Sequence, residues 1–298
     1  MTGPYRHLRP DVREIADADA AFRIRRIRTD RWIAYARAET ILAELEDLLT
    51  VPKRMRMPNL LLVGPTNNGK TMIVEKFRRG HPAIDPIDAD DGVARVPVLR
   101  IQMPPGPDEG RFFRAILKAL GMPGRVNERP AIAQESAMAL MEMTGVQLLV
   151  IDELHNLISG SRLQQRRLLN LLRWLGNELQ IPLVGVGTAE ALRAVRSDDQ
   201  LSNRFEPFVL PPWVQGEHCS RLLSTLEAVL PLRKPSGLAE PVLSAKILAA
   251  AEGVLGEIMA IVTRAAVQAV ASGTERITAG MIDKTSFRPP SERRSVTA

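Results

Sequence analysis

The chain has 298 residues, of which 45% are apolar, and 40 Lys and Arg residues against 34 Asp and Glu residues give it a formal net charge of +6. This length is sufficient for one large domain or two smaller ones with buried cores. The four histidines are scattered and have no partner cysteines at metal-ligand spacing, so we expect no structural zinc. The single cysteine, Cys219, excludes an internal disulfide, and we expect a reducing, cytoplasmic compartment.

The hydropathy pattern shows no run of about 18 uncharged apolar residues, so we expect no membrane span. Acidic residues among the first arginines, without an apolar segment, do not indicate a signal peptide. The basic excess permits nucleic-acid binding without establishing it. With only 4% aromatic residues, contact with the backbone of a duplex fits better than stacking on single-stranded bases.

Residues 1–31 are expected to form an irregular basic arm that includes five arginines between Arg23 and Arg31. Such an arm either touches DNA or a protein partner, or is a solvated extension. Residues 32–50 carry apolar side chains at a spacing near 3.6, which predicts an amphipathic helix that ends before Pro52. A basic connector, residues 53–58, leads into the first strand.

A glycine loop between an apolar run, 59–63, and a helical run, 72–77, matches the phosphate-loop pattern G-x-x-x-x-G-K-[ST] at every fixed position. Its glycines let backbone N–H groups surround a phosphate chain, and the following helix adds the positive end of its dipole. The lysine can reach the β- and γ-phosphates, and the threonine hydroxyl can bind Mg²⁺. The expected nucleotide-binding residues are Gly64, Pro65, Thr66, Asn67, Asn68, Gly69, Lys70 and Thr71.

The next segments alternate between strand and helix patterns. A loop over 80–94 precedes a strand over 96–103, and helices are expected over 111–120 and 131–143, the latter with Met138, Met141 and Met143 as core residues. Residues 147–153 form a continuous apolar run that ends in Asp152 and Glu153, which predicts a central parallel strand with its acids at the ligand-binding edge. Asp152 is placed to hold Mg²⁺, and Glu153 to polarise the water that attacks the γ-phosphate.

Residues 162–179 predict a helix with buried leucines, Leu163 among them, and a basic face that either lies on DNA phosphates or is solvated or subunit-facing. A buried strand over 181–188 ends at Thr188, which contacts the nucleotide, caps the next helix, or does both. Arg204 precedes the last strand, 208–210; it either completes a neighbouring subunit's site or forms a surface ion pair. The arginines considered for DNA contact are Arg111, Arg114, Arg162 and Arg166.

These elements predict an α/β fold, with a phosphate-loop core in which helices flank a parallel sheet and a small all-α domain follows. The expected divisions are the basic arm 1–31, a nucleotide-binding domain 32–211, a helical domain 212–287 after the hinge Pro211–Pro212, and a disordered tail 288–298.

The order of phosphate loop, strand ending in Asp-Glu, polar strand end, late arginine and helical lid resembles an AAA+ ATPase. The flanks of these motifs are similar to those of the TniB transposition ATPases, over roughly residues 30–285: RMPNLLLVG before TNNGKT, then VIDELHN, Gly187-Thr188 and Asn203-Arg204-Phe205. TniB proteins in turn resemble the TnsC regulators of Tn7-like transposons.

The resemblance implies that Gly64 to Thr71 are Walker A, Asp152 and Glu153 Walker B, Thr188 sensor 1 and Arg204 the arginine finger. It further implies ATP and Mg²⁺ as cofactors, assembly as a ring or filament on double-stranded DNA, and recruitment of a DDE transposase, often with a TniQ-type adaptor. The chain departs from the pattern in the helical domain: residues 253–258 offer no sensor 2 arginine, and Arg264 comes a turn or two late.

Three other functions remain open at this stage. A helicase-loader-like AAA+ protein would have a replicative helicase as its partner. A small-molecule kinase with a phosphate loop would act as a monomer, but the Asp-Glu pair, Arg204 and the helical lid argue against it. A switch that binds ATP without hydrolysing it is disfavoured by Glu153.

Overall fold

The computed structural model describes residues 4–90, 92–123, 129–284 and 288–295. The chain forms two compact units. The α/β unit contains residues 40–65 and 70–210. The helical unit contains residues 1–39 and 211–298 together with the short segment Thr66–Gly69 from the middle of the phosphate loop. The chain therefore passes between the units several times, and the loop that carries the nucleotide motif is shared by both.

The α/β unit is built on a five-stranded parallel sheet in the order β2-β3-β4-β1-β5. Apolar runs that are buried along their length form its central strands, as expected for a parallel sheet covered on both faces. The strands are β1 (Asn59–Val63), β2 (Val98–Gln102), β3 (Leu148–Asp152), β4 (Leu183–Gly187) and β5 (Phe205–Val209). All strands of a parallel sheet end at one edge, so the residues that follow β1, β3 and β4 converge there.

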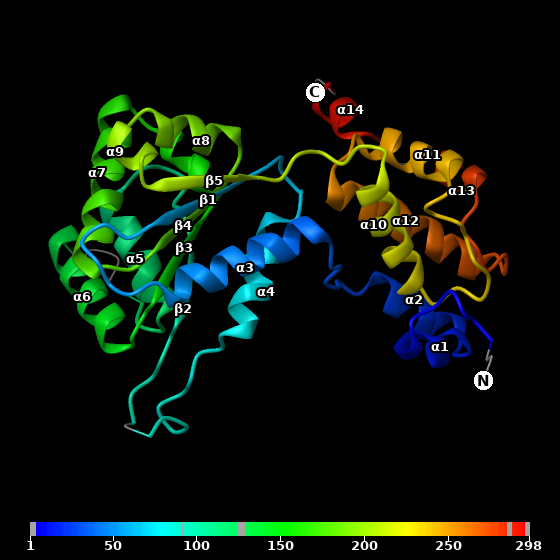
Figure 1. Ribbon diagram of the computed structural model, residues 1–298, viewed down its shortest axis with the longest axis horizontal. Helices are drawn as coiled ribbons and strands as arrows, with labels where there is room; N and C mark the ends of the chain where they lie inside the picture. Colours follow the sequence, from blue (N-terminus) through cyan, green and yellow to red (C-terminus); the bar gives the residue numbers. More distant parts are fainter. Residues whose placement is uncertain (1–3, 91, 124–128, 285–287, 296–298) are drawn as a thin grey trace. The chain divides into compact units, whose positions relative to one another are not determined.

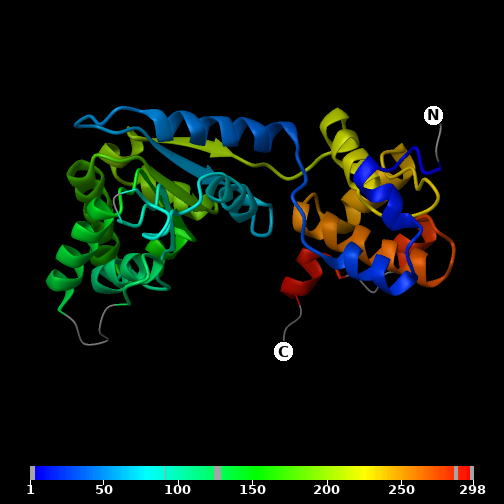
Figure 2. The same ribbon diagram turned by 90° about the horizontal axis from the view of Figure 1, so that it is seen from below.

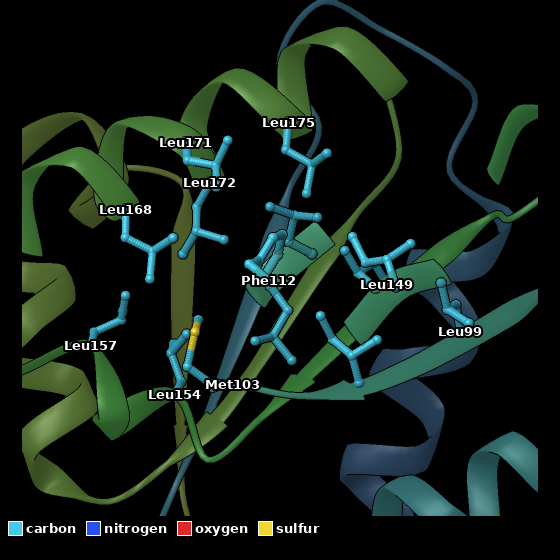
Figure 3. Close-up of a cluster of buried hydrophobic side chains, with 14 of the residues drawn as sticks. Leu99, Met103, Phe112, Leu149, Leu154, Leu157, Leu168, Leu171, Leu172 and Leu175 are labelled. Atoms are coloured by element: carbon cyan, nitrogen blue, oxygen red, sulfur yellow. The ribbon is translucent and has the colours of Figure 1, made fainter. Parts of the chain in front are cut away.

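One face of this sheet forms the main core. Alternate strand residues, such as Leu61, Leu99 and Leu149, pack against helices α5 (Glu109–Ala119), α6 (Pro130–Met143) and α7 (Arg162–Leu179). Figure 3 shows leucines of α7 directed at Phe112 and Leu149. Helix α4 contacts β2 and β4 (Figure 1). The helices of the unit are α4 (Lys70–Gly80), α5 (Glu109–Ala119), α6 (Pro130–Met143), the 3₁₀ helix η1 (Leu154–Ser159), α7 (Arg162–Leu179), α8 (Ala189–Arg196), α9 (Asp199–Ser202) and most of α3 (Ala36–Thr50).

The helical unit has its own apolar core around helix α12, whose inward side includes Ile258, Ile261 and Ala265. Figure 2 shows the blue helix α2 (Ala20–Arg28) lying against the orange helix α12 (Leu255–Ala271), and the two helices are in contact. The helices are α1 (Pro10–Ala16), α2 (Ala20–Arg28), α10 (Glu217–Ala228), α11 (Pro241–Ala251), α12 (Leu255–Ala271), α13 (Ala279–Lys284) and α14 (Pro290–Ser295).

The expectation of an irregular arm over residues 1–31 is wrong, because helices α1 and α2 lie there and belong to the helical unit. Arg23 is 2% exposed and pairs with the carboxylate of Glu275, while its Nε and Nη2 donate to the carbonyl oxygen of Pro231. Ile27 joins the core of the unit. The arginine-rich run thus alternates between buried and exposed side chains, which its charge alone did not reveal.

The disordered tail expected over 288–298 is also corrected, because residues 290–295 form α14. Arg293 pairs with Glu257 at 2.5 Å, and the backbone N–H of Ser291 donates to the carboxylate of Glu252. The sequence of this short helix has no apolar face, and the helix is instead held by these polar contacts with Glu257 and Glu252. The last part of the expected tail, residues 296–298, lies outside the described residues.

Two apolar side chains expected in the core are exposed. Leu163, in the first turn of α7, and Met143, at the end of α6, are both more than half exposed. Each lies at the end of its helix, where the apolar face of the helix extends beyond the core that it covers. Among the residues that the structure describes, no helix is both long and apolar enough to cross a bilayer.

The buried ion pair predicts a large effect for Arg23→Ala. The substitution leaves the carboxylate of Glu275 without its charged partner, so we expect a loss of about 3–5 kcal/mol in the free energy of unfolding. The measurement is urea denaturation followed by circular dichroism. Arg9→Ala is the matched control, since Arg9 and Asp11 form an exposed pair worth about 1 kcal/mol or less. Equal effects of the two substitutions would contradict the prediction.

Candidate functional site

The phosphate loop connects the carboxyl end of β1 to the first residue of α4, which is Lys70. The side chain of Lys70 folds back over the loop, and its Nζ donates to the carbonyl oxygens of Gly64 at 2.8 Å and Pro65 at 2.7 Å. Burial lowers the pKa of Lys70, against the opposing effect of the carboxylates of Glu153 and Asp152. The loop conformation needs Gly69, whose φ of +85° lies in the left-handed region. An ammonium group held at this position can bind the phosphates of a nucleotide.

Asp152, the last residue of β3, is 2% exposed and has donors at both carboxylate oxygens. Its Oδ2 accepts from Thr71 Oγ1 at 3.0 Å and from Arg100 Nη2 at 2.7 Å. Its Oδ1 accepts from the backbone N–H of Glu153 at 2.9 Å. Mg²⁺ prefers oxygen ligands, and here a hydroxyl oxygen and a carboxylate oxygen lie beside a phosphate loop. Thr71 and Asp152 can therefore bind the metal ion of a nucleotide complex.

Glu153 directly follows the strand in a left-handed conformation, with φ of 55°. Its Oε2 lies 3.1 Å from His155 Nε2, and its side chain is 42% exposed. A left-handed non-glycine residue at a strand end is unusual, and such residues gather at functional sites. Glu153 is thus accessible to water and held by a neighbour, which suits a carboxylate that polarises an attacking water.

Thr188 follows β4 at the same edge of the sheet, since Val63 pairs with Gly187 and the N–H of Gly64 donates to the carbonyl of Gly187 at 3.1 Å. It stands at the N-cap position of α8, but its side chain makes no capping hydrogen bond to the first turn of that helix; its hydroxyl lies 3.5 Å from Glu190 Oε2. The sequence left open whether this hydroxyl caps the helix. It does not, and a role beside the nucleotide stays a prediction.

The middle of the phosphate loop is bound to the start of α12 within the helical unit. Asn68, 2% exposed, accepts the N–H of Leu255 at 3.0 Å and donates to the carbonyl of Pro211 at 3.2 Å. Asn67 accepts the N–H of Gly256 on its backbone carbonyl at 2.9 Å and donates through Nδ2 to Glu257 at 3.1 Å. The two asparagines thereby make the first turn of α12 a direct support of the loop.

Arg204 lies at the opposite edge of the sheet from the phosphate loop. Phe205 pairs with Asn59 at the start of β1, whereas the loop follows Val63, about 13 Å further along the strand. Arg204 donates to Asn177 at 2.7 Å and lines a pocket of about 550 Å³ together with Arg54 and Arg56. The structure therefore brings Lys70, Thr71, Asp152 and Glu153 together and leaves Arg204 outside that group.

The arginines considered for DNA contact lie on two helices of the α/β unit. Arg111 and Arg114 of α5 line a hollow of about 350 Å³ with Lys118. Arg162 and Arg166 are exposed on the first two turns of α7. Both sets lie on parts of their helices that are open to solvent, and their contact with DNA stays a prediction.

Three features of the candidate site were not predicted from the sequence. Arg100 interrupts the apolar strand β2 and reaches Asp152; a charge inside an otherwise apolar strand was the signal for it. Arg54 and Arg56 lie in a segment that reads as a connector, and only folding places them beside Arg204. The partners of Asn67 and Asn68 lie between 143 and 190 residues away in the sequence, so local pattern could not identify them.

Comparison with known proteins places this site in a family. A family model described as "Bacterial TniB protein" matches residues 23–215, well over half of the chain. The chain belongs to the TniB family. The match contains every residue that the phosphate loop, the Asp-Glu pair, Thr188 and Arg204 contribute to this TniB protein. Among curated proteins, no sequence match was found.

Solved structures similar to this TniB protein show its fold. The ORC2 protein of Aeropyrum pernix in ADPNP–ADP complexes is 14% identical, with a TM-score of 0.60 over 87% of this chain and 71% of that chain. The ORC1 protein of Aeropyrum pernix in complex with DNA is 20% identical, with a TM-score of 0.58 over 87% and 67%. Cdc6p from Pyrobaculum aerophilum is 17% identical, with a TM-score of 0.52 over 87% and 68%. The fold is that of AAA+ proteins, a parallel sheet flanked by helices with a C-terminal helical region.

The contacts of Asn68 predict that Asn68→Ala lowers the free energy of unfolding by about 1–3 kcal/mol, because the N–H of Leu255 and the carbonyl of Pro211 both lose a partner. Urea denaturation measures the change. Asn170→Ala, which removes an exposed amide that accepts from Arg173, is the control and should change stability by less than about 0.5 kcal/mol. A loss no greater than that of the control would show that the link contributes nothing.

Proposed function

We propose that this TniB protein binds ATP with Mg²⁺ and hydrolyses it slowly, and that hydrolysis sets how long an assembly of the protein stays on DNA. The observation that carries the proposal is the convergence of Lys70, Thr71 and Asp152 at one edge of the sheet. In this proposal Lys70 binds the β- and γ-phosphates, and Thr71 and Asp152 hold Mg²⁺, which neutralises phosphate charge when bound. Glu153 accepts the proton of the attacking water, and Thr188 orients that water or the γ-phosphate.

The position of Arg204 supports a site shared between subunits. The length of β1, about 13 Å, separates Arg204 from the phosphate loop of its own chain, so Arg204 cannot reach phosphates bound by that loop. In a ring or filament, the amino edge of one sheet can face the phosphate loop of the next subunit, and Arg204 then neutralises charge in the transition state. ATP binding would favour assembly through that contact, and hydrolysis would favour disassembly.

We propose that the assembly forms on double-stranded DNA and marks a target for a DDE transposase, with a TniQ-type adaptor. TniB membership and the arginines of α5 and α7, Arg111, Arg114, Arg162 and Arg166, support this function. The ORC1 protein of similar fold was solved in complex with DNA, which agrees with a duplex as the partner. Contacts of this kind to phosphates weaken steeply as salt rises.

Lys70→Ala tests the proposal. Because the ammonium group is lost, we expect the affinity for ATP to fall at least about a hundredfold. Assembly on duplex DNA in the presence of a non-hydrolysable ATP analogue should disappear with it, as measured by light scattering at two salt concentrations. Lys76→Ala, an exposed lysine on the same helix, is the control. A wild-type protein that stays monomeric and ignores DNA would refute the proposal and favour a small-molecule kinase, while co-purification with a replicative helicase would favour a loader.

Arg204→Ala tests the shared site. We expect the DNA-stimulated ATPase rate to fall by about 10³-fold while ATP affinity changes by less than about twofold, because the finger acts on a neighbour's transition state. Mixing Arg204→Ala with Lys70→Ala subunits should restore activity at about one quarter of the interfaces, where an intact loop meets an intact finger. Arg173→Ala, which loses a contact to Gln200, is the control. No recovery on mixing would place Arg204 outside the neighbour's site.

A further inference from the structure

Arg100 is the charged residue of β2, on the sheet face opposite the main core. It pairs in register with Val150, which pairs with Val184 of β4, whereas Leu99 and Ile101 point into the core on the other face. Helix α4 contacts β2 and β4. A guanidinium group lies in this layer because it reaches Asp152, two residues along the neighbouring strand, at 2.7 Å.

The contact with Asp152 saturates one carboxylate oxygen. Oδ2 has two lone-pair directions, and Thr71 Oγ1 and Arg100 Nη2 donate to it together. Oδ1 already accepts the N–H of Glu153. Arg100 Nε is buried and has no hydrogen-bond partner among the described residues, so part of this guanidinium is available for another acceptor.

We infer that Arg100 is a positioning residue that competes with Mg²⁺ for Asp152 and so couples metal binding to nucleotide binding. The inference rests on the proposed function of the site. A metal ion, or its bound water, can use Oδ2 when one donor leaves. The Thr71 hydroxyl can turn and offer its own oxygen to a cation, but an arginine stays charged at any ordinary pH and must move away.

Release of Arg100 is opposed by the loss of its ion pair and favoured by phosphate oxygens that the freed guanidinium can reach. Mg²⁺ alone brings a second positive charge close to Arg100 and supplies no acceptor for it. Mg²⁺ that arrives with a nucleotide brings the same positive charge together with phosphate oxygens that accept hydrogen bonds from the guanidinium. The arrangement therefore disfavours the bare metal and favours the metal–nucleotide complex, because like charges a few ångströms apart repel strongly in a partly buried site.

Arg100→Met tests this inference, since methionine occupies a similar length without charge. The measurement is the free Mg²⁺ concentration that gives half-maximal binding of a fluorescent ATP analogue, with direct Mn²⁺ binding to the nucleotide-free protein followed by electron paramagnetic resonance. We expect Arg100→Met to tighten Mn²⁺ binding to the nucleotide-free protein by about five- to tenfold. The half-maximal Mg²⁺ concentration for the analogue should not fall by that factor, because the contact of the freed guanidinium with phosphate oxygens is lost as well. Arg100→Lys, which keeps the charge, should stay within about twofold of wild type.

Two controls separate the possible outcomes. Arg78→Met removes another arginine–carboxylate pair, with Glu75 on α4 at 2.9 Å, and should leave metal dependence unchanged. Arg100→Gln gives a second neutral variant if methionine impairs folding, and circular dichroism checks both. Mn²⁺ binding to the nucleotide-free protein that is unchanged or weaker in the neutral variants overturns the inference, because an arginine that merely orients Asp152 would lower metal affinity when lost. Failure of the wild type to bind the analogue at all would instead refute the proposed ATP site.

Discussion

The buried carboxylate of Asp152 is the constraint around which the α/β unit is arranged. A carboxylate that is 2% exposed must have its oxygens hydrogen-bonded, and the donors come from three places: Thr71 at the start of α4, Arg100 on β2 and the backbone of Glu153. Satisfying it fixes the first turn of α4 against the end of β3. The phosphate loop precedes that turn, so its position depends on the same hydrogen bonds.

A parallel sheet has two chemically different edges, and this protein has candidate functional residues at both. The carboxyl edge holds Lys70, Thr71, Asp152 and Glu153, while the amino edge has a pocket lined by Arg54, Arg56 and Arg204. Strands hold the edges apart, so residues at the two edges of one sheet cannot act on one phosphate group. A reaction that needs both edges requires two copies of the chain, which is why ATP use and assembly are joined in the proposed function.

The middle of the phosphate loop is held within the helical unit by the first turn of α12. This turn offers the N–H groups of Leu255 and Gly256 and the carboxylate of Glu257 to Asn68 and Asn67. Glu257 also pairs with Arg293 of α14. The C-terminal helix therefore contributes to a hydrogen-bonded set that ends at the loop.

Local pattern in the sequence was enough to determine the strands, most helices, the phosphate loop and the Asp-Glu pair, because hydrophobic period and glycine spacing act over a few residues. The resemblance to AAA+ ATPases followed from the order of those motifs, and the resemblance to TniB proteins followed from the residues that flank them. Only the tertiary structure decided that Arg23 is buried against Glu275, that residues 290–295 are helical, and that Arg100 binds Asp152. Each of these depends on a partner distant in sequence, and the charge of an arginine alone does not tell whether water or a carboxylate will neutralise it.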